Sequence, residues 1–372
     1  YGETLPHYTW GKVSDEALIR VRGSNPAELF GDDSLGAGLQ MAIYDVVGKA
    51  LEVPVHHLFN LKKVRDWCPI AWWNTKMSPQ DLAGEAQDAV KAGYTFHKFK
   101  TRPWFDVYEQ VEAISAVTPE HYRLDMDWNG MLMNVGTAAP VLQRLDQYER
   151  VAIYEGPINQ QDVEGQRELR RKVSKPIAIH FGSPPFHTAV REAVCDGFVV
   201  GGGIPTVLRQ GQLAGEFEKP FWLQMVGTGL VTALSAHLGA VLPFAQWPTI
   251  TCLNNYTDDL LKEPLTIQGG YLKVPEGPGL GVEFNEAALS QYAMDAPYRL
   301  PDERHILSVV WQGGRVVHFA NMKDHCWPHF RQHGNDPAQE PGATLEIWDN
   351  DGSKEWAKLY ARLQQGPVRE QR

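Results

Sequence analysis

Four charged residues stand at the ends of three strand-like segments of this chain. Lys98 and Lys100 close the segment HKFK, Asp127 lies in DMDWNG, and Glu155 lies in AIYEGP. Each segment follows an apolar run and precedes a helix-like stretch, which is how a parallel α/β barrel gathers catalytic groups at one mouth. A lysine pair could bind a small acid, and carboxylates could hold a hard cation or assist proton transfer.

The next strand-like segment, KPIAIHFGSPP, interrupts this series. It carries His180 and Phe181 where a third carboxylate would be expected. The pattern therefore predicts an acid-binding barrel mouth with one position that departs from the others.

These segments belong to a regular alternation of strands and helices. Strands are predicted at residues 69–74, 94–100, 122–128, 151–155, 176–181, 197–202, 220–226 and 249–255. Helices are predicted between them, at residues 78–92, 105–117, 136–147, 162–173, 186–193, 206–216 and 229–241. One helix between successive strands is the signature of a (β/α)8 barrel. An open doubly wound sheet is the competing architecture, but the chain has neither a GxGxxG motif nor a P-loop.

Composition narrows the class of protein. The 372 residues are 43% hydrophobic and 22% charged, as expected for a globular protein with room for a barrel and a smaller domain. A formal net charge of −10 argues against nucleic acid as a partner, and no apolar run is long enough to predict a membrane span. Four scattered cysteines without CxxC spacing favour reduced thiols and a cytoplasmic location.

Three regions are expected along the chain. Residues 1–66 are predicted as a partial N-terminal capping domain, residues 67–265 as the barrel, and residues 266–372 as a return to the cap followed by an extension. The sequence begins at Tyr1, and YGETLP reads like the end of a strand, so we expect that a native N-terminal segment is missing.

Smaller elements are predicted outside the barrel. Residues 35–51 have apolar side chains at helical spacing before Pro54. In the extension, a Gly-Gly turn between alternating apolar residues predicts a β-hairpin over residues 305–320, and a short helix is expected over 353–363.

Seven motifs, in order and at matching spacing, resemble the mandelate racemase and muconate lactonizing branch of the enolase superfamily. They are MAIYDVVGKALEVPVHHLF, KFK, DWNG, EGP, GGGIPTVLR, SAHLGAVLP and PEGPGLGVEF. The resemblance covers roughly residues 1–290. It implies a modified (β/α)8 TIM barrel with an α+β capping domain formed from both chain ends, whose N-terminal strands are missing here.

The resemblance also implies a chemistry. Family members bind Mg²⁺ through carboxylates on three successive barrel strands, and the metal stabilises an enediolate formed by removing a proton α to a carboxylate. Asp127 and Glu155 match the first two ligand positions, and oxygen ligands suit Mg²⁺. Lys100 matches the general base, Lys98 the neighbour that lowers its pKa and contacts the substrate carboxylate, and Asn129 a second-shell partner.

The chain departs from the family pattern at three positions. The third ligand position falls on Phe181, so the carboxylate triad is incomplete; His180 could serve as a nitrogen ligand, better suited to another divalent metal than to Mg²⁺. The family's His-Asp dyad is also missing. Asp196 stands only at the start of its strand, and Gln224, a further second-shell candidate, occupies the stretch where the dyad's His would lie. A two-base racemase is not expected.

Three functions remain open. The first is a lyase or isomerase that dehydrates or epimerises a sugar acid, with Lys100 as base, His180 in a catalytic or ligand role, and Mg²⁺ or another divalent metal on Asp127 and Glu155. The second is a degenerate barrel that binds acids without metal-dependent turnover, and the third uses Lys98 or Lys100 as a Schiff-base amine. The expected binding partner is a small-molecule carboxylate substrate, and no nucleic acid or membrane is expected. The protein is also expected to form a homo-oligomer.

Overall fold

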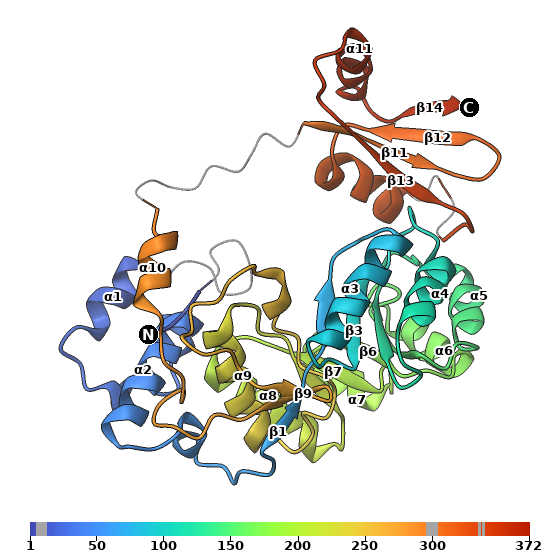
Figure 1. Cartoon of the computed structure of the whole chain (residues 1–372). Helices are drawn as coiled ribbons and strands as arrows, with labels where there is room; N and C mark the ends of the chain where they lie inside the picture. Colours follow the sequence, from blue (N-terminus) through green and yellow to red (C-terminus); the bar gives the residue numbers. More distant parts are fainter. Residues whose placement is uncertain (5–12, 295–303, 334–335, 337–338) are drawn as a thin grey trace. The chain divides into compact units, whose positions relative to one another are not determined.

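The structure is a computed structural model that describes residues 1–4, 13–294, 304–333, 336 and 339–372. The chain forms two compact units (Figure 1). The first unit contains Tyr1–Asn74, Ala89–Lys98 and Ile177–Ala293, and the second contains Thr75–Asp88, Phe99–Pro176 and Met294–Arg372. Each unit is described by itself.

Seven strands form one sheet in the order β2-β3-β4-β5-β6-β7-β8, so every strand neighbours the next one along the chain. The strands are β2 (Trp72–Asn74), β3 (Phe96–Lys100), β4 (Arg123–Asp127), β5 (Val151–Glu155), β6 (Ile177–His180), β7 (Gly197–Val200) and β8 (Phe221–Leu223). They are almost wholly buried because they consist mainly of apolar residues, as strands covered on both faces require. The predicted α/β class with a modified barrel is confirmed.

One helix lies between each pair of successive strands, as the periodicity predicted. These are α3 (Pro79–Lys91), α4 (Val107–Val117), α5 (Val135–Leu145), α6 (Val163–Lys172), α7 (Phe186–Arg191) and α8 (Ile204–Glu216), and α9 (Gly229–Val241) follows the last strand. Asp106, Asn134 and Asp162 cap α4, α5 and α6 by accepting backbone hydrogen bonds. Such caps fix the residue at which each strand-to-helix turn ends.

The predicted eighth strand at residues 249–255 is wrong as an extended strand. Only isolated parallel bridges form there, between Ile70 and Thr249 and between Gln224 and Ile250. Cys252 then takes a left-handed conformation (φ 57°) and the chain turns into the 3-10 helix η4 (Leu253–Asn255). Within the first unit, this short segment nevertheless lies between β8 and the residues that precede β2.

The N-terminal region is helical. It contains α1 (Asp15–Val21), the 3-10 helices η1 (Pro26–Leu29) and η2 (Asp33–Leu35), α2 (Ala37–Ala50) and the 3-10 helix η3 (Val55–Phe59). The predicted helix over residues 35–51 is therefore confirmed as α2. The expected strand end in YGETLP extends into residues outside the described part of the chain.

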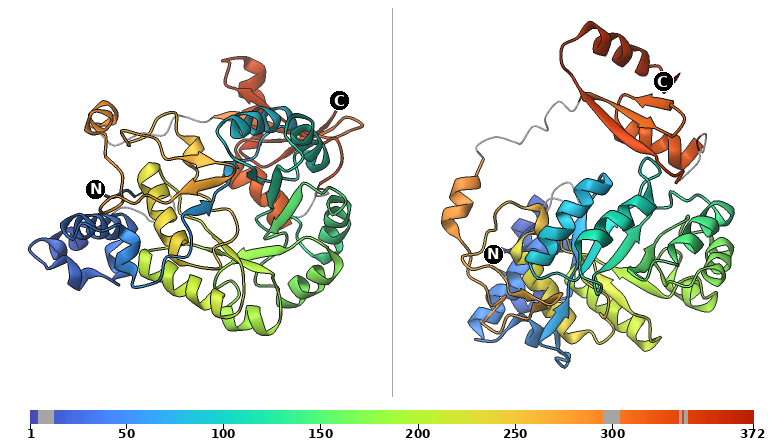
Figure 2. Two further views of the ribbon diagram at one scale, coloured as in Figure 1. Left: turned by 60° about the horizontal axis from the view of Figure 1, so that its bottom comes forward. Right: turned by 45° about the vertical axis from the view of Figure 1, so that its right-hand side comes forward.

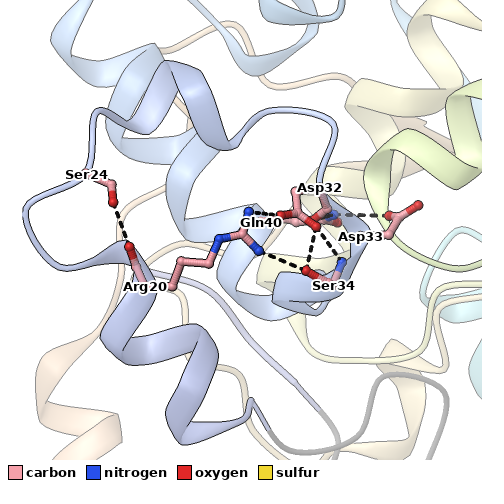
Figure 3. A network of polar contacts seen from close by, with 6 residues as sticks. All are labelled: Arg20, Ser24, Asp32, Asp33, Ser34 and Gln40. Atoms are coloured by element: carbon pink, nitrogen blue, oxygen red, sulfur yellow. Dashed lines mark hydrogen bonds and ion pairs between the residues drawn. The ribbon is translucent and has the colours of Figure 1, made fainter.

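A polar network surrounds η2 (Figure 3), and Gln40 of this network also contacts the barrel helix α8. The Gln40 amide nitrogen donates to the Asp32 carbonyl at 2.7 Å, and its amide oxygen accepts from the backbone N–H of Ile204, the first residue of α8, at 2.9 Å. Arg20 pairs with Asp32, which also accepts from Ser34. A side chain at Gly203 would collide with Asp33, because an added Cβ would lie 2.1 Å from that carboxylate.

After the barrel, the chain returns to the N-terminal helices. Strands β9 (Ile267–Gln268) and β10 (Tyr271–Lys273) form an antiparallel sheet with β1 (Trp67–Pro69). The backbone N–H of Leu280 then donates to the Asp45 carboxylate of α2 at 2.9 Å. The helix α10 (Glu286–Tyr292) follows this return.

Residues 304–372 form a C-terminal module within the second unit. Its antiparallel sheet has the order β13-β11-β12-β14, with β11 (His305–Val310), β12 (Arg315–Phe319), β13 (Thr344–Asp349) and β14 (Val368–Gln371). The π-helical turns η5 (Met322–Cys326) and η6 (His329–His333) lie on one side of this sheet and α11 (Lys354–Leu363) on the other (Figures 1 and 2). The predicted hairpin is confirmed, with Gly313 and Gly314 both at positive φ in its turn.

The C-terminal module is anchored on the loops that follow β3 and β4. Trp104, Phe105 and Met131 of these loops pack into one buried cluster with Leu307, Val309, Trp311, Val317, Phe319, Cys326, Phe330 and Ala343 of the module. The Asp106 carboxylate also accepts from the backbone N–H of Gly342 at 2.8 Å. Within the second unit, the module is therefore bound directly to the loops at the ends of two barrel strands.

A buried histidine pair lies under the N-terminal region of the first unit. The Nδ1 atoms of His56 and His237 are 3.1 Å apart, and His237 Nε2 lies 3.1 Å from the Leu280 carbonyl. Because a carbonyl only accepts, His237 must donate through Nε2 and accept from His56 through Nδ1. Burial lowers the pKa of His237 to about 3 and also lowers the pKa of His56, so both rings are neutral at pH 7.

No helix in the described part of the chain combines the length and apolarity that a membrane span needs.

The neutral histidine pair predicts a loss of stability in mild acid. Because the folded pKa of His237 is depressed, its contribution is full above the unfolded pKa of about 6.5 and is lost as pH falls below it, by up to about 1.4 kcal/mol per pH unit. We expect the free energy of unfolding of the His56→Leu/His237→Leu variant to fall less between pH 7.5 and 5.5 than that of the wild type. Denaturant titrations at the two pH values measure this difference.

Exposed His121 provides the control. His121→Gln should keep the wild-type pH dependence. An unchanged pH dependence in the double variant would contradict neutral burial of the pair.

The anchoring cluster predicts that Trp104→Ala destabilises the second unit. Trp104 is fully buried, and truncation of a buried tryptophan costs about 3–5 kcal/mol. Ile347→Ala, at a site on β13 that is 59% exposed, should change the free energy of unfolding by less than about 0.5 kcal/mol. Denaturant titration of both variants tests the cluster, and equal effects would show that the loop contact adds no stability.

Candidate functional site

The two lysines stand at alternate positions at the end of β3, so they project from the same face of the strand. Lys98 is completely buried, whereas the Lys100 side chain is 18% exposed. Phe99, between the two lysines, is buried on the other face of the strand.

In the second unit, Lys100 forms an ion pair with Asp127. Its amine contacts Asp127 Oδ2, and the Asp127 side chain is 1% exposed. Asp127 is paired in register with Glu155 on the adjacent parallel strand, and Glu155 is also buried. The predicted base and the two predicted metal ligands of this unit therefore end neighbouring strands.

The turn after β4 keeps the Asp127 carboxylate in place. Asn129 adopts a left-handed conformation (φ 48°), and its backbone N–H donates to Asp127 Oδ1 at 3.0 Å. Gly130, at φ 79°, donates to the Gly156 carbonyl at 2.7 Å and thereby joins this turn to the one after β5. Asn129 thus contacts the Asp127 carboxylate through its backbone N–H.

In the first unit, Lys98 has two well-defined neighbours. Its amine lies 4.5 Å from the centre of the Trp222 ring and donates to Gln224 Oε1 at 3.2 Å. A cation over an indole face gains electrostatic attraction that partly offsets its loss of hydration. Gln224, predicted as a second-shell residue, therefore orients the buried lysine.

Phe181, which the count along the sequence places at the third ligand position, directly follows the last residue of β6. His180 is paired in register with Val199, which is paired in turn with Trp222, the residue under Lys98. Residues paired across parallel strands share a face, so His180 belongs to the Trp222 face of the first unit. Phe181 instead stacks on Phe186 of α7, with ring centres 4.9 Å apart.

Asp196, the aspartate nearest to the expected dyad position, has a structural contact instead. The Asp196 carboxylate accepts from the backbone N–H of Ile177 at 2.9 Å, which places it at the start of β6 rather than at the carboxyl end. It therefore stabilises the strand origin, away from the end that carries His180.

Sequence reasoning missed one residue of this region, Arg102. It is only 3% exposed, and its guanidinium donates to Asn129 Oδ1 at 2.6 Å and to the Asp127 carbonyl at 3.2 Å. Burial lowers the pKa of Arg102 to about 10, whereas Asp127 and Glu155 favour its charged form, so it remains a cation at pH 7. The sequence contains one indication of this residue: the large apolar residues Trp104 and Phe105 follow Arg102 closely, which is typical of a loop that is buried by other parts of the protein.

The expected Mg²⁺ requires several oxygen ligands at one site. Throughout the described part of the chain, no group of three or more His, Cys, Asp or Glu side chains is arranged to hold a metal ion. Asp127 and Glu155 supply two carboxylates, but Asp127 is engaged by Lys100, and the Arg102 cation lies nearby. This arrangement does not fit a dication without rearrangement, because a third ligand is lacking and two positive charges already face the pair.

Comparison with known proteins places the chain. A family model described as enolase C-terminal domain-like matches residues 81–288, more than half of the chain. Arabinonate dehydratase from Saccharolobus solfataricus is 25% identical over 305 residues, covering 78% of this chain and 79% of that protein. N-succinylamino acid racemase from Thermus thermophilus is 28% identical over 279 residues, covering 72% of each chain.

A solved structure agrees with this placement at the level of the fold. The mandelate racemase/muconate lactonizing family protein from Azoarcus sp. EbN1 superimposes with a TM-score of 0.64 and 24% identity, covering 78% of this chain and 87% of that chain. The matched barrel region includes both lysines, both carboxylates and His180. The chain therefore belongs to the enolase superfamily, in its branch of mandelate racemase/muconate lactonizing enzyme-like proteins.

Proposed function

We propose that this protein removes a proton from the carbon next to the carboxylate of a small acid, with the Lys100 amine as the base. The observation that carries the proposal is the position of Lys100 at the carboxyl end of β3, beside the end of β4, where barrels hold their reactive groups. Lys100 is also the more exposed of the two lysines, so a substrate can reach its amine.

Charge complementarity supports an acidic substrate. An α-proton beside a carboxylate is only weakly acidic, so a base must act together with positive charge that stabilises the enediolate. Lys98 offers such a charge from the same strand face, held by Trp222 and Gln224. Sugar acids are the favoured substrate class, because relatives of this chain include arabinonate dehydratase.

Dehydration is favoured over racemisation because it needs only one base. Lys100 takes the α-proton, and the C–H electron pair becomes part of the enediolate. The Lys100 ammonium formed in this step then returns the proton to the β-hydroxyl, which leaves as water, and the resulting enol becomes a 2-keto acid. No step is assigned to the Mg²⁺ or other divalent metal that the family resemblance implies, because the described side chains do not provide its ligand set.

A second candidate is an acid-binding barrel without turnover. It is favoured by the Lys100–Asp127 ion pair, since an ammonium that stays paired with a buried carboxylate is not a base. Both candidates require the lysine face to bind a small acid, but only the first requires exchange of the α-proton.

The base assignment predicts a large effect of Lys100→Met. With a panel of sugar acids in D₂O, we expect the wild type to exchange the α-proton of at least one acid or to dehydrate it. Lys100→Met should lower that rate at least about 100-fold, as removal of a general base typically does. Proton NMR of the substrate, followed over time, measures both exchange and dehydration.

Lys262→Met serves as a matched control because Lys262 is an exposed lysine paired with Glu283 outside the barrel end. It should retain the wild-type rate. Saturable acid binding without any α-proton exchange in the wild type would support the second candidate, and exchange that survives in Lys100→Met would exclude Lys100 as the base.

A further inference from the structure

Arg102 is a buried cation that the proposed reaction does not use. Besides Asn129 and Asp127, it donates to the carbonyl of Thr101 at 2.7 Å. Its Nε has no hydrogen-bond partner in the described part of the chain. These acceptors are neutral oxygens, and the Arg102 cation also interacts electrostatically with Asp127 and Glu155.

The C-terminal module holds this guanidinium from its other side. The Arg102 Cζ atom lies 4.7 Å from the centre of the Trp327 ring, which follows η5 and packs against the buried cluster of the module. The backbone N–H of Asp106 donates to the Ala343 carbonyl at 3.1 Å, so the loop that carries Arg102 is bound to the module at a second point. A planar guanidinium stacked on an indole is well ordered, because both flat surfaces match.

Two cations, Lys100 and Arg102, act on the Asp127–Glu155 pair. Asp127 and Glu155 bring two negative charges when ionised, and Lys100 and Arg102 bring two positive charges. A dication entering the same region would face two cations at short range in a largely dry environment, where repulsion is strong. At least one of the two side chains, Lys100 or Arg102, would have to move away before Asp127 and Glu155 could act as metal ligands.

We propose that Arg102, fixed by Trp327 of the C-terminal module, is a positioning residue that balances the charge of the Asp127–Glu155 pair and keeps a divalent cation out of it. In addition to packing on the loops after β3 and β4, the module thereby affects the charge around the Asp127–Glu155 pair. The inference concerns the same carboxylates as the proposed function, but it is tested by metal binding alone, so either can fail without the other.

The test is Mn²⁺ binding to the full chain, followed by electron paramagnetic resonance of free Mn²⁺. Mn²⁺ alone is used because it takes oxygen ligands and reports binding directly. We expect the wild type to bind Mn²⁺ more weakly than about 1 mM, which is the weak end of protein sites for hard dications. Arg102→Gln, which removes the charge, should tighten binding at least about tenfold, equivalent to about 1.4 kcal/mol.

Three matched variants make the result specific. Arg102→Lys keeps the charge and should bind no more tightly than the wild type. Arg331→Gln removes an exposed guanidinium that lies 5.9 Å from the same Trp327 ring, and it should gain less than Arg102→Gln. Asp127→Asn added to Arg102→Gln should abolish the gained site.

Two results would overturn the proposal. One is a wild-type site that binds one equivalent of Mn²⁺ tightly and is lost in Asp127→Asn. The other is a folded Arg102→Gln variant whose gain does not exceed that of Arg331→Gln. The wild-type measurement decides the first result even if Arg102→Gln fails to fold.

Discussion

Compensation of two buried carboxylates is the constraint on which this barrel end depends. Asp127 and Glu155 end adjacent strands in register and are almost completely removed from water. Buried charges of like sign are costly unless cations and hydrogen bonds face them. Lys100, the Asn129 backbone N–H and the nearby Arg102 guanidinium meet this requirement within the second unit. The chemistry available to the site follows from how these cations are held.

The C-terminal module contributes to this charge compensation because it contacts Arg102. Arg102 stays buried because Trp327 covers it, and Trp327 is held by the cluster that includes Trp104 and Phe330. Packing by residues far along the chain thus sets the position of the Arg102 charge in the loop after β3. In the first unit, the buried Lys98 amine is contacted by an indole face and by the Gln224 amide oxygen.

Much of the fold could be predicted because its signals are local. The helix that became α9 and the strand that became β5 have apolar periods that match the observed bounds. The eighth strand could not be predicted correctly, because Cys252 turns into a left-handed conformation that no propensity indicates. Phe181 shows a related limit: counting from a neighbouring proline gives a position along the sequence, whereas the face of the strand follows only from pairing such as that of His180 with Val199.

The sequence by itself determined the barrel class, the family and the order of the charged strand ends, because each depends on spacing along the chain. Tertiary structure decided which charges meet. Only the fold brings Trp327 onto Arg102, pairs Lys100 with Asp127, and turns Phe181 toward α7. These contacts join residues distant in sequence, and their energies depend on burial and separation, neither of which a linear pattern contains.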